Sequence, residues 1–211
     1  MTIAIIVGMT SESRLASPLG HPIAIGGGTT AGATQAAQNL IAQGATALIS
    51  FGLAAGLDPS LPPGTLINPT HIIDGHLRYP TAPTLIPWAP PPARTIAGTS
   101  TILSTTAQKL ALFQLTGAAA ADMESHAIAQ AATAAKIPFA VLRAIADPAT
   151  TTLPHAALNA LDPDGTPNLP RILRSLASNP TQLPALLTLA LHAAQATRAL
   201  KTVIASAPKT R

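Results

Sequence analysis

Two acidic signatures near the middle of the chain carry side chains suited to acid and base chemistry. The first is Asp122-Met123-Glu124, and the second, one helix length further on, runs from Val141 through Arg143 to Asp147. Only 9% of the 211 residues are charged, so we expect a carboxylate beside an apolar strand to have a function. A carboxyl group at a partly desolvated strand end has a raised pKa and can act as a general acid, whereas an arginine-paired carboxylate stays charged.

Two carboxyl groups with these separate roles are suited to the cleavage of a glycosidic bond. One protonates the leaving group, while the other stabilises the sugar. On this interpretation Asp147 is the acid and Glu124 holds the sugar. The alternative is that Glu124 and Arg143 form a buried ion pair and that Asp147 only caps the helix that follows. The spacing alone leaves both interpretations open.

Apolar runs and Ala-rich segments predict the elements that must position these side chains. We expect strands at residues 3–7, 23–25, 45–51, 66–73, 96–104 and 138–146, and helices at 29–43, 106–115, 122–136 and 183–205. Residues 80–92 hold six prolines and are predicted to form an irregular loop.

The alternation of strands and helices predicts an α/β fold. We expect three layers, α/β/α, with a central mixed, mostly parallel sheet. Ligands of such sheets bind outside the carboxyl ends of the strands. Glu12, the segment Gly52–Gly56 and Asp147 each follow a predicted strand, so we expect them to converge there.

The length and composition favour a single domain over residues 1–211, with a helical C-terminal part at about 153–206. The sequence has no cysteine, which excludes disulfides, a thiol nucleophile and cysteine-ligated zinc. The six histidines show no metal-ligand spacing, so no metal site is predicted. No Walker or Rossmann fingerprint, signal peptide or membrane-spanning stretch is recognisable, and we expect a cytoplasmic protein.

Charge is unevenly distributed along the chain, whose formal net charge is +4. No acidic residue follows Asp164, whereas six basic residues do: Arg171, Arg174, Arg198, Lys201, Lys209 and Arg211. This basic segment is either a solvated helix face or a peripheral contact with the anionic surface of the inner membrane. Nucleic acid is not expected as a partner, because interleaved aromatic residues and known DNA-binding motifs are lacking.

Four sequence blocks resemble the nucleoside phosphorylase and nucleosidase superfamily, and they occur in the order found in that family. They cover much of the first 150 residues and comprise residues 3–12, 52–64, 123–129 and 138–147. The chain is similar to the methylthioadenosine/S-adenosylhomocysteine nucleosidases, and more similar to the hopanoid-associated phosphorylases. The segments 153–158 and 161–165 carry the latter resemblance.

The resemblance implies a nucleoside phosphorylase-like fold and a role for each matched residue. Asp147 would donate a proton or hydrogen bond to N7 of the departing purine. Met123 and Glu124 would bind the ribose, with the glutamate accepting from the 2′ and 3′ hydroxyls, and Glu12 would position the attacking water of the hydrolytic branch. Arg143 would orient the carboxylates, and Ala54 and Gly56 would also contact substrate.

The resemblance leaves the nucleophile open, because Leu53 and Ala146 replace residues that are often polar in relatives. If the nucleophile is phosphate, the candidates to bind it are the glycine-rich turn at the start of the helix predicted at 29–43 and a nearby cation: Gly27, Gly28, Thr29 and Arg14. The alternative for the glycines is a plain tight turn. No cofactor is expected beyond phosphate as a co-substrate.

The chain is shorter than the nucleosidase branch between Asp74 and Gly98, and a proline-rich loop with Tyr79 and Trp88 stands there. We hypothesise that this opens the 5′ side of the ribose to a bulky apolar substituent; a simple loop deletion is the alternative. The resemblance then implies a phosphorylase of hopanoid biosynthesis, active as a homodimer, that releases adenine from adenosylhopane by pentosyl transfer and gives phosphoribosylhopane. A methylthioadenosine/S-adenosylhomocysteine nucleosidase and a non-catalytic nucleoside-binding module are the alternatives.

Overall fold

A mixed sheet forms the centre of the computed structural model, which describes residues 1–158 and 168–208. Its main path has the order β2-β1-β3-β8-β7-β5-β6, and β9 pairs with both β3 and β4. The strands of the described residues are β1 (Ile3–Val7), β2 (Ile23–Ile25), β3 (Ala47–Gly56), β4 (Leu66–Ile67), β5 (His71–Asp74), β6 (Leu77–Pro80), β7 (Thr95–Gly98), β8 (Ala120–Asp122) and β9 (Phe139–Asp147). Five strand pairs are parallel and three are antiparallel.

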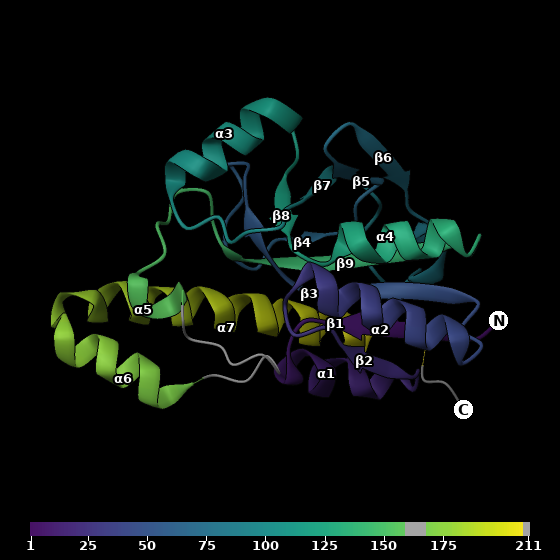
Figure 1. Cartoon of the computed structure of the whole chain (residues 1–211), viewed down its shortest axis with the longest axis horizontal. Coiled ribbons are helices and arrows are strands. Elements are labelled where there is room, and N and C mark those ends of the chain that lie inside the picture. The colour runs from purple at the N-terminus through teal and green to yellow at the C-terminus, as the bar shows by residue number, and fades with distance from the viewer. Residues whose placement is uncertain (159–167, 209–211) are drawn as a thin grey trace.

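Helices cover both faces of this sheet (Figure 1). They are α1 (Thr10–Ala16), α2 (Thr30–Ala42), α3 (Thr106–Thr116), α4 (Ser125–Ala134), α5 (His155–Leu158), α6 (Leu169–Ser178) and α7 (Leu183–Ala205), with short 3₁₀ turns η1 (Ser17–Leu19), η2 (Pro83–Leu85) and η3 (Pro180–Gln182). α2 and α4 share one buried apolar cluster with the sheet, and α1 and α7 share another. The predicted three-layer, mostly parallel α/β/α fold is therefore confirmed.

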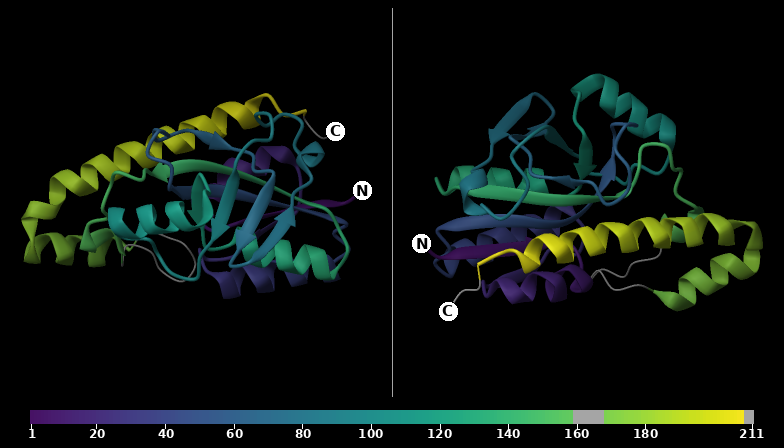
Figure 2. Two further views of the ribbon diagram at one scale, coloured as in Figure 1. Left: turned by 90° about the horizontal axis from the view of Figure 1, so that it is seen from above. Right: turned by 180° about the vertical axis from the view of Figure 1, so that it is seen from behind.

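Small aliphatic side chains allow the helices to approach the sheet closely. Ala33, Ala37 and Leu40 face the sheet from α2, and Ala196, Leu200 and Ile204 face it from α7 at a spacing of four residues. Figure 2 shows α7 running along one face of the sheet and extending beyond it. Because i and i+4 positions lie on one face of a helix, these residues bury one continuous stripe.

β3 and β9 form the parallel pair on which the functional residues lie. All nine residues of β9 are buried, and its register places Arg143 opposite Gly52 of β3. The register shifts between Ala54 and Ala55, so that Ala55 pairs with Asp147, the last residue of β9. The sequence prediction ended the third strand too early, since pairing with β9 continues through the glycine and alanine residues to Gly56.

Three other predicted elements differ from the structure. The strand predicted at 66–73 is split into β4 and β5, with Pro69 in the gap between them, because proline cannot donate to a strand ladder. The strand predicted at 96–104 ends at Gly98. The helix predicted at 122–136 begins only at Ser125, because residues 120–122 form β8. α1, β6 and β8 were not predicted.

Three helices, α5, α6 and α7, follow β9 in the described C-terminal part of the chain. Residues 159–167, which belong to the range 153–206 predicted to be helical, lie outside the described residues. The same holds for the segment 161–165 that carried part of the subfamily resemblance and for Lys209 and Arg211. Within the described part of the chain, no helix is both long and apolar enough to cross a bilayer.

Candidate active site

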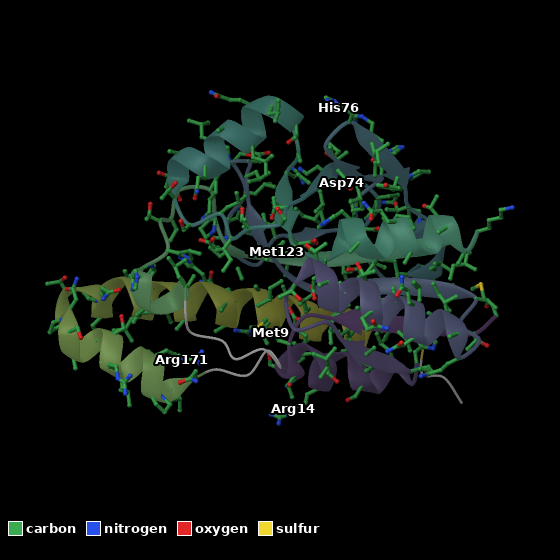
Figure 3. All side chains as sticks on the ribbon, viewed as in Figure 1. Met9, Arg14, Asp74, His76, Met123 and Arg171 are labelled. Atoms are coloured by element: carbon green, nitrogen blue, oxygen red, sulfur yellow. The ribbon has the colours of Figure 1, made fainter. Side chains whose placement is uncertain are left out.

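A cavity of about 310 Å³ lies where the C-terminal ends of β1, β8 and β9 come together. It brings together three predicted carboxyl groups, those of Glu12, Glu124 and Asp147. The remaining lining is largely apolar or small and comprises Gly8, Met9, Gly28, Leu53, Ala54, Ala55, Thr99, Thr101, Ile102, Leu103, Ala121, Asp122, Met123, Ala146 and Leu153. Met9 and Met123 lie toward the middle of the molecule in Figure 3.

Glu12 is fixed by the backbone around it. Its Oε2 accepts hydrogen bonds from the amides of Gly8 and Met9, both at 2.9 Å, and its Oε1 accepts from the amide of Leu53 at 2.8 Å. Burial raises the pKa of Glu12 above its ordinary value, although the nearby Arg143 and these amides act in the opposite direction. The first turn of α1 thus presents a rigid carboxyl group to the cavity.

Glu124 stands directly before α4 and keeps one carboxylate oxygen available. Its Oε2 accepts from Nη2 of Arg143 at 3.2 Å, whereas its buried Oε1 has no hydrogen-bond partner in the structure. Burial, with contributions from Glu12 and Asp122, raises the pKa of Glu124 to about 7 even though Arg143 opposes the rise. An unsatisfied buried acceptor costs free energy unless a ligand donates to it, which makes Oε1 the natural acceptor for a hydroxyl group.

Arg143 is buried at the centre of the polar network and contacts two carboxylates. Its Nε donates to Oδ2 of Asp122 at 2.7 Å, and its Nη2 also donates to Ser50 at 2.8 Å and to Ser125 at 3.2 Å. The ion pair between Glu124 and Arg143 that the sequence left as an alternative is therefore present. It coexists with the exposure of Glu124 to the cavity, so the two interpretations of Glu124 do not exclude each other.

Asp122 is a site residue that the sequence analysis did not select. Its Oδ1 accepts from the amides of Glu124 and Ser125, at 3.0 and 2.7 Å, and so caps the N-terminus of α4. Burial alone would raise the pKa of Asp122, but Arg143 and the hydrogen bonds from Ser125 and Glu124 outweigh it and lower the pKa. The signal that could have found it is its place two residues before Glu124, since β8 ends there.

Asp147 lines the cavity and is paired with a second unpredicted residue, Lys109 of α3. Nζ of Lys109 lies 2.7 Å from Oδ1 of Asp147. Burial raises the pKa of Asp147, while Lys109 and His192 oppose the rise. Asp147 does not cap a following helix, because Pro148 comes next and α5 begins only at His155, so this part of the alternative interpretation is wrong. The available signal for Lys109 was its position as the single charged residue in an otherwise uncharged helix.

The predicted phosphate and substrate residues divide into those at the cavity and those away from it. Gly28 and Ala54 line it, whereas Gly27, Thr29 and Gly56 do not. A Cβ at Gly56 would lie 3.0 Å from Ile145 and 3.2 Å from Pro148, so this glycine is packed within the fold. Arg14 is also excluded: it is exposed on the outer side of α1 and points away from the body of the molecule (Figure 3). The prediction that Arg14 joins the glycines is therefore wrong, since the turn of α1 that directs Glu12 inward directs Arg14 outward.

The glycine-rich turn itself precedes α2 as predicted. Gly27 and Gly28 have φ angles of 69° and 67°, and Thr29 is the N-cap, its hydroxyl accepting from the amide of Gly32 at 3.1 Å. A Cβ at Gly28 would meet no atom within 4 Å, which places open space beside this backbone.

The proline-rich segment does not form a wall of the cavity. None of the residues from 75 to 98 lines it. The amide of Ala82 donates to the carbonyl of Phe139, at the start of β9, whereas Asp147 ends that strand. Trp88 packs with the apolar cluster beneath α7. The expectation that the short segment opens the 5′ side of the ribose stays a prediction, and the cavity lining here comes from Thr99, Thr101, Ile102, Leu103 and Leu153.

Among residues 1–158 and 168–208, no group of three or more histidine, aspartate or glutamate side chains is arranged to hold a metal ion.

Comparisons with known proteins agree with the fold. The sequence model of the phosphorylase superfamily matches residues 18–178. A search of curated proteins finds no significant match. Among solved structures, the S-adenosylhomocysteine nucleosidase of Streptococcus pyogenes, in complex with 5-methylthiotubericidin, has a TM-score of 0.68 at 17% identity, covering 99% of this chain and 98% of that one.

Two proteins of Helicobacter pylori are similar to the same extent. Its 5′-methylthioadenosine/S-adenosylhomocysteine nucleosidase has a TM-score of 0.67 at 15% identity and covers 97% of this chain and 98% of its own. Its futalosine hydrolase has the same TM-score and identity, with 97% of each chain covered.

Proposed function

Because the chain belongs to the phosphorylase superfamily, we propose that it is a purine nucleoside phosphorylase that releases adenine from adenosylhopane and forms phosphoribosylhopane. The observation that carries the proposal is that the carboxyl groups of Glu12, Glu124 and Asp147 line one cavity. Phosphorylases and nucleosidases of this kind need no cofactor. The finer choice among substrates depends on the chemistry of the cavity.

The leaving base is assigned to Asp147. When the C1′–N9 bond breaks, its electron pair moves onto the purine, and a proton on N7 neutralises the charge that develops there. Burial, which raises the pKa of Asp147, favours the protonated carboxyl group that this step requires. The carboxylate that remains afterwards faces Lys109.

The ribose is assigned to Glu124 and Met123. Oε1 of Glu124 is buried, lacks a partner and can accept from a sugar hydroxyl, while Arg143 holds the other oxygen. A carboxylate near the ring also stabilises the positive charge of an oxocarbenium-like transition state. Ionised Glu124 therefore serves both the binding of the sugar and the cleavage of its bond.

Phosphate as nucleophile is supported by the turn at Gly27 and Gly28, which precedes α2 and borders the cavity at Gly28. One observation favours water instead, and with it a nucleosidase: no lysine or arginine of the described residues lines the cavity. Glu12, fixed beside Leu53, would then position the attacking water. Hydrolysis is accordingly the second candidate.

An apolar 5′ substituent is supported by what we term the apolar rim, made of Ile102, Leu103 and Leu153. Ile102 is 48% exposed although it borders the cavity, so it has apolar surface left for a ligand. Burying such surface against a hydrocarbon contributes about 25 cal/mol per Å². A hopane side chain would use this rim, whereas a small polar substituent would leave it in water.

Contact with the cytoplasmic face of the inner membrane, where a lipid substrate would reside, is supported by the exposed leucine row Leu183, Leu187 and Leu191 of α7. The three residues are four apart and therefore share one helix face. No acidic residue follows Asp164 in the sequence, so anionic lipid meets no like charge there. Flotation with vesicles containing anionic lipid, compared with neutral vesicles, tests this; dimerisation that removes the row from solvent is the opposing outcome.

The decisive experiment measures adenine release from adenosylhopane and from methylthioadenosine, each with and without phosphate. Phosphate-dependent release from adenosylhopane, slowed by about 10²–10⁴ in Asp147→Asn, is the expected result. Phosphate-independent release would establish the hydrolase, and faster release from methylthioadenosine would reject the lipid substrate. A third outcome would indicate a non-catalytic module: the wild type and Asp147→Asn bind nucleoside equally well, and neither protein releases adenine.

A further inference from the structure

Lys109 is buried in a way that needs an explanation. It is 0% exposed, on a helix whose other residues are at least partly accessible, although lysine is almost never fully buried without partners. Its ammonium group has three donors, and three acceptors surround it: Oδ1 of Asp147 at 2.7 Å and the carbonyls of Pro148 and Thr151 at 3.0 and 2.7 Å. All three acceptors belong to the end of β9 and the turn that follows it.

We propose that Lys109 is a positioning residue for Asp147, fixing one of its oxygens and stabilising the carboxylate that remains when its proton moves to the leaving base. The inference rests on the proposed function of Asp147 as the acid. Lys109 itself is not among the residues that line the cavity, so it acts through Asp147 rather than on the substrate.

The geometry supports different roles for the two carboxylate oxygens of Asp147. Lys109 engages Oδ1, so Oδ2 is the oxygen that meets N7 of the base. The carbonyl contacts to Pro148 and Thr151 tie the turn after β9 to α3 and set the direction of the carboxyl group. Positioning the acid lowers the activation free energy, because reacting groups that are already held in place lose little further entropy in the transition state.

The charge of Lys109 has a second effect on the reaction. During cleavage the O–H bond of Asp147 breaks, the proton goes to N7, and a carboxylate is left 2.7 Å from an ammonium group. This interaction is stronger in the transition state than in the ground state, which is the condition for catalysis. The other titratable group that acts on Asp147 is His192 of α7.

The test uses two neutral variants, Lys109→Gln and Lys109→Met. The control is Lys136→Gln, because Lys136 is an exposed lysine that precedes β9, whereas Asp147 ends that strand. The first readout is the titration of the Asp147 carboxyl carbon by ¹³C NMR in the substrate-free protein, assigned with Asp147→Asn. We expect the Asp147 pKa to rise in both Lys109 variants and to stay unchanged in Lys136→Gln. An unchanged Asp147 pKa in the Lys109 variants would overturn the proposal.

The second readout is the pH profile of kcat for adenine release. Loss of Lys109 should lower kcat about 10- to 100-fold, leave KM nearly unchanged and move the alkaline limb of the profile to higher pH. A uniform fall in kcat without movement of the limb would show that Lys109 only supports the fold. If Lys109→Met does not fold, Lys109→Gln retains a donor for the carbonyls and carries the test. The NMR titration needs no substrate, so it remains decisive even if the proposed reaction fails.

Discussion

Nε of Arg143 donates to Oδ2 of Asp122 at 2.7 Å, a shorter contact than the 3.2 Å between Arg143 and Glu124. Asp122 is therefore the principal counter-ion of the buried guanidinium. Because its charge is already matched, Arg143 stabilises ionised Glu124 less than an unshared partner would. Burial, together with the charges of Glu12 and Asp122, outweighs the guanidinium and raises the pKa of Glu124 to about 7.

Asp122→Asn should destabilise the fold strongly. The variant keeps an acceptor for the amides of α4 but removes the charge opposite Arg143, which is buried and has no way to reach water. Breaking one partner of a buried pair costs about 3–5 kcal/mol. The free energy of unfolding from urea denaturation measures this loss.

Asp74→Asn is the matched control for Asp122→Asn. Asp74 accepts from the exposed side chain of Gln130 at 2.7 Å and is not part of the buried network. Its replacement should change the free energy of unfolding by less than about 1 kcal/mol. Equal losses in the two variants would contradict a special role for the contact between Asp122 and Arg143.

Glu124 should make the stability of the protein depend on pH in an unusual direction. Its pKa is raised from 4.5 to about 7, so the folded state binds more protons than the unfolded state between these values. Stability from this group is fully present below pH 4.5 and is lost as the pH rises through about 7, by about 3 kcal/mol in total. Glu124→Gln removes this contribution, so unfolding free energies measured from pH 5 to 8 should fall less steeply than those of the wild type.

The same substitution should impair the reaction. Glutamine matches the protonated form of Glu124 and cannot stabilise positive charge on the ribose. We expect kcat/KM for nucleoside cleavage to fall about 10- to 100-fold, the cost of a hydrogen bond to a charged group. In the wild type the acid limb of kcat/KM should follow the ionisation of Glu124 near pH 7, and a profile without that limb would argue against its role.

Asp147→Asn tests the acid. The amide cannot donate a proton to the purine, and kcat should fall by about 10²–10⁴. Asparagine keeps the shape of the side chain, so substrate binding measured by calorimetry should persist. Retention of full activity would show that the base departs without protonation by Asp147.

The fold was predictable from sequence because its strongest signals are apolar. The runs at 3–7 and 138–146 became β1 and β9, and the Ala-rich segment at 29–43 became α2. The short strand β8 escaped prediction because its three residues, Ala120 to Asp122, are as compatible with a helix as with a strand. Its pairing with β7 and β3, which are separate segments of the sequence, makes these residues a strand.

The site was predictable for residues that lie at a strand end or within a few positions of it, and not for Lys109, which comes from a helix that starts further from a strand end. Glu12 and Asp147 both lie at or just beyond strand ends, and parallel strands bring such ends to one edge. Lys109 reaches the site from the first turns of α3, and its one local signal, that it is the single charged residue of the helix, does not say what it contacts. Arg14 was predicted at the site but does not lie there. It stands two residues after Glu12 in α1 and faces outward.

Gly52→Ala should disable the site from within the sheet. Gly52 has a φ of 155°, and a Cβ there would meet Oε1 of Glu12 and lie 2.6 Å from Nη1 of Arg143. Neither group can yield cheaply, because three amides hold Glu12 and the buried Arg143 is bonded to Asp122 and Glu124. We expect a loss of most activity and a destabilisation of about 2 kcal/mol or more.

Gly44→Ala separates backbone strain from this steric effect. Gly44 follows α2 with a φ of 94°, and a Cβ there would meet no atom within 4 Å. The strain alone should cost about 1 kcal/mol and leave the rate of adenine release unchanged, since no site residue is displaced. Measuring unfolding and activity for both variants therefore shows whether Gly52 is needed for its backbone angle or for the space it leaves. Activity in Gly52→Ala equal to that of Gly44→Ala would mean that Glu12 and Arg143 can move without harm to the reaction, and it would remove the rigid Glu12 carboxyl group from the proposed mechanism.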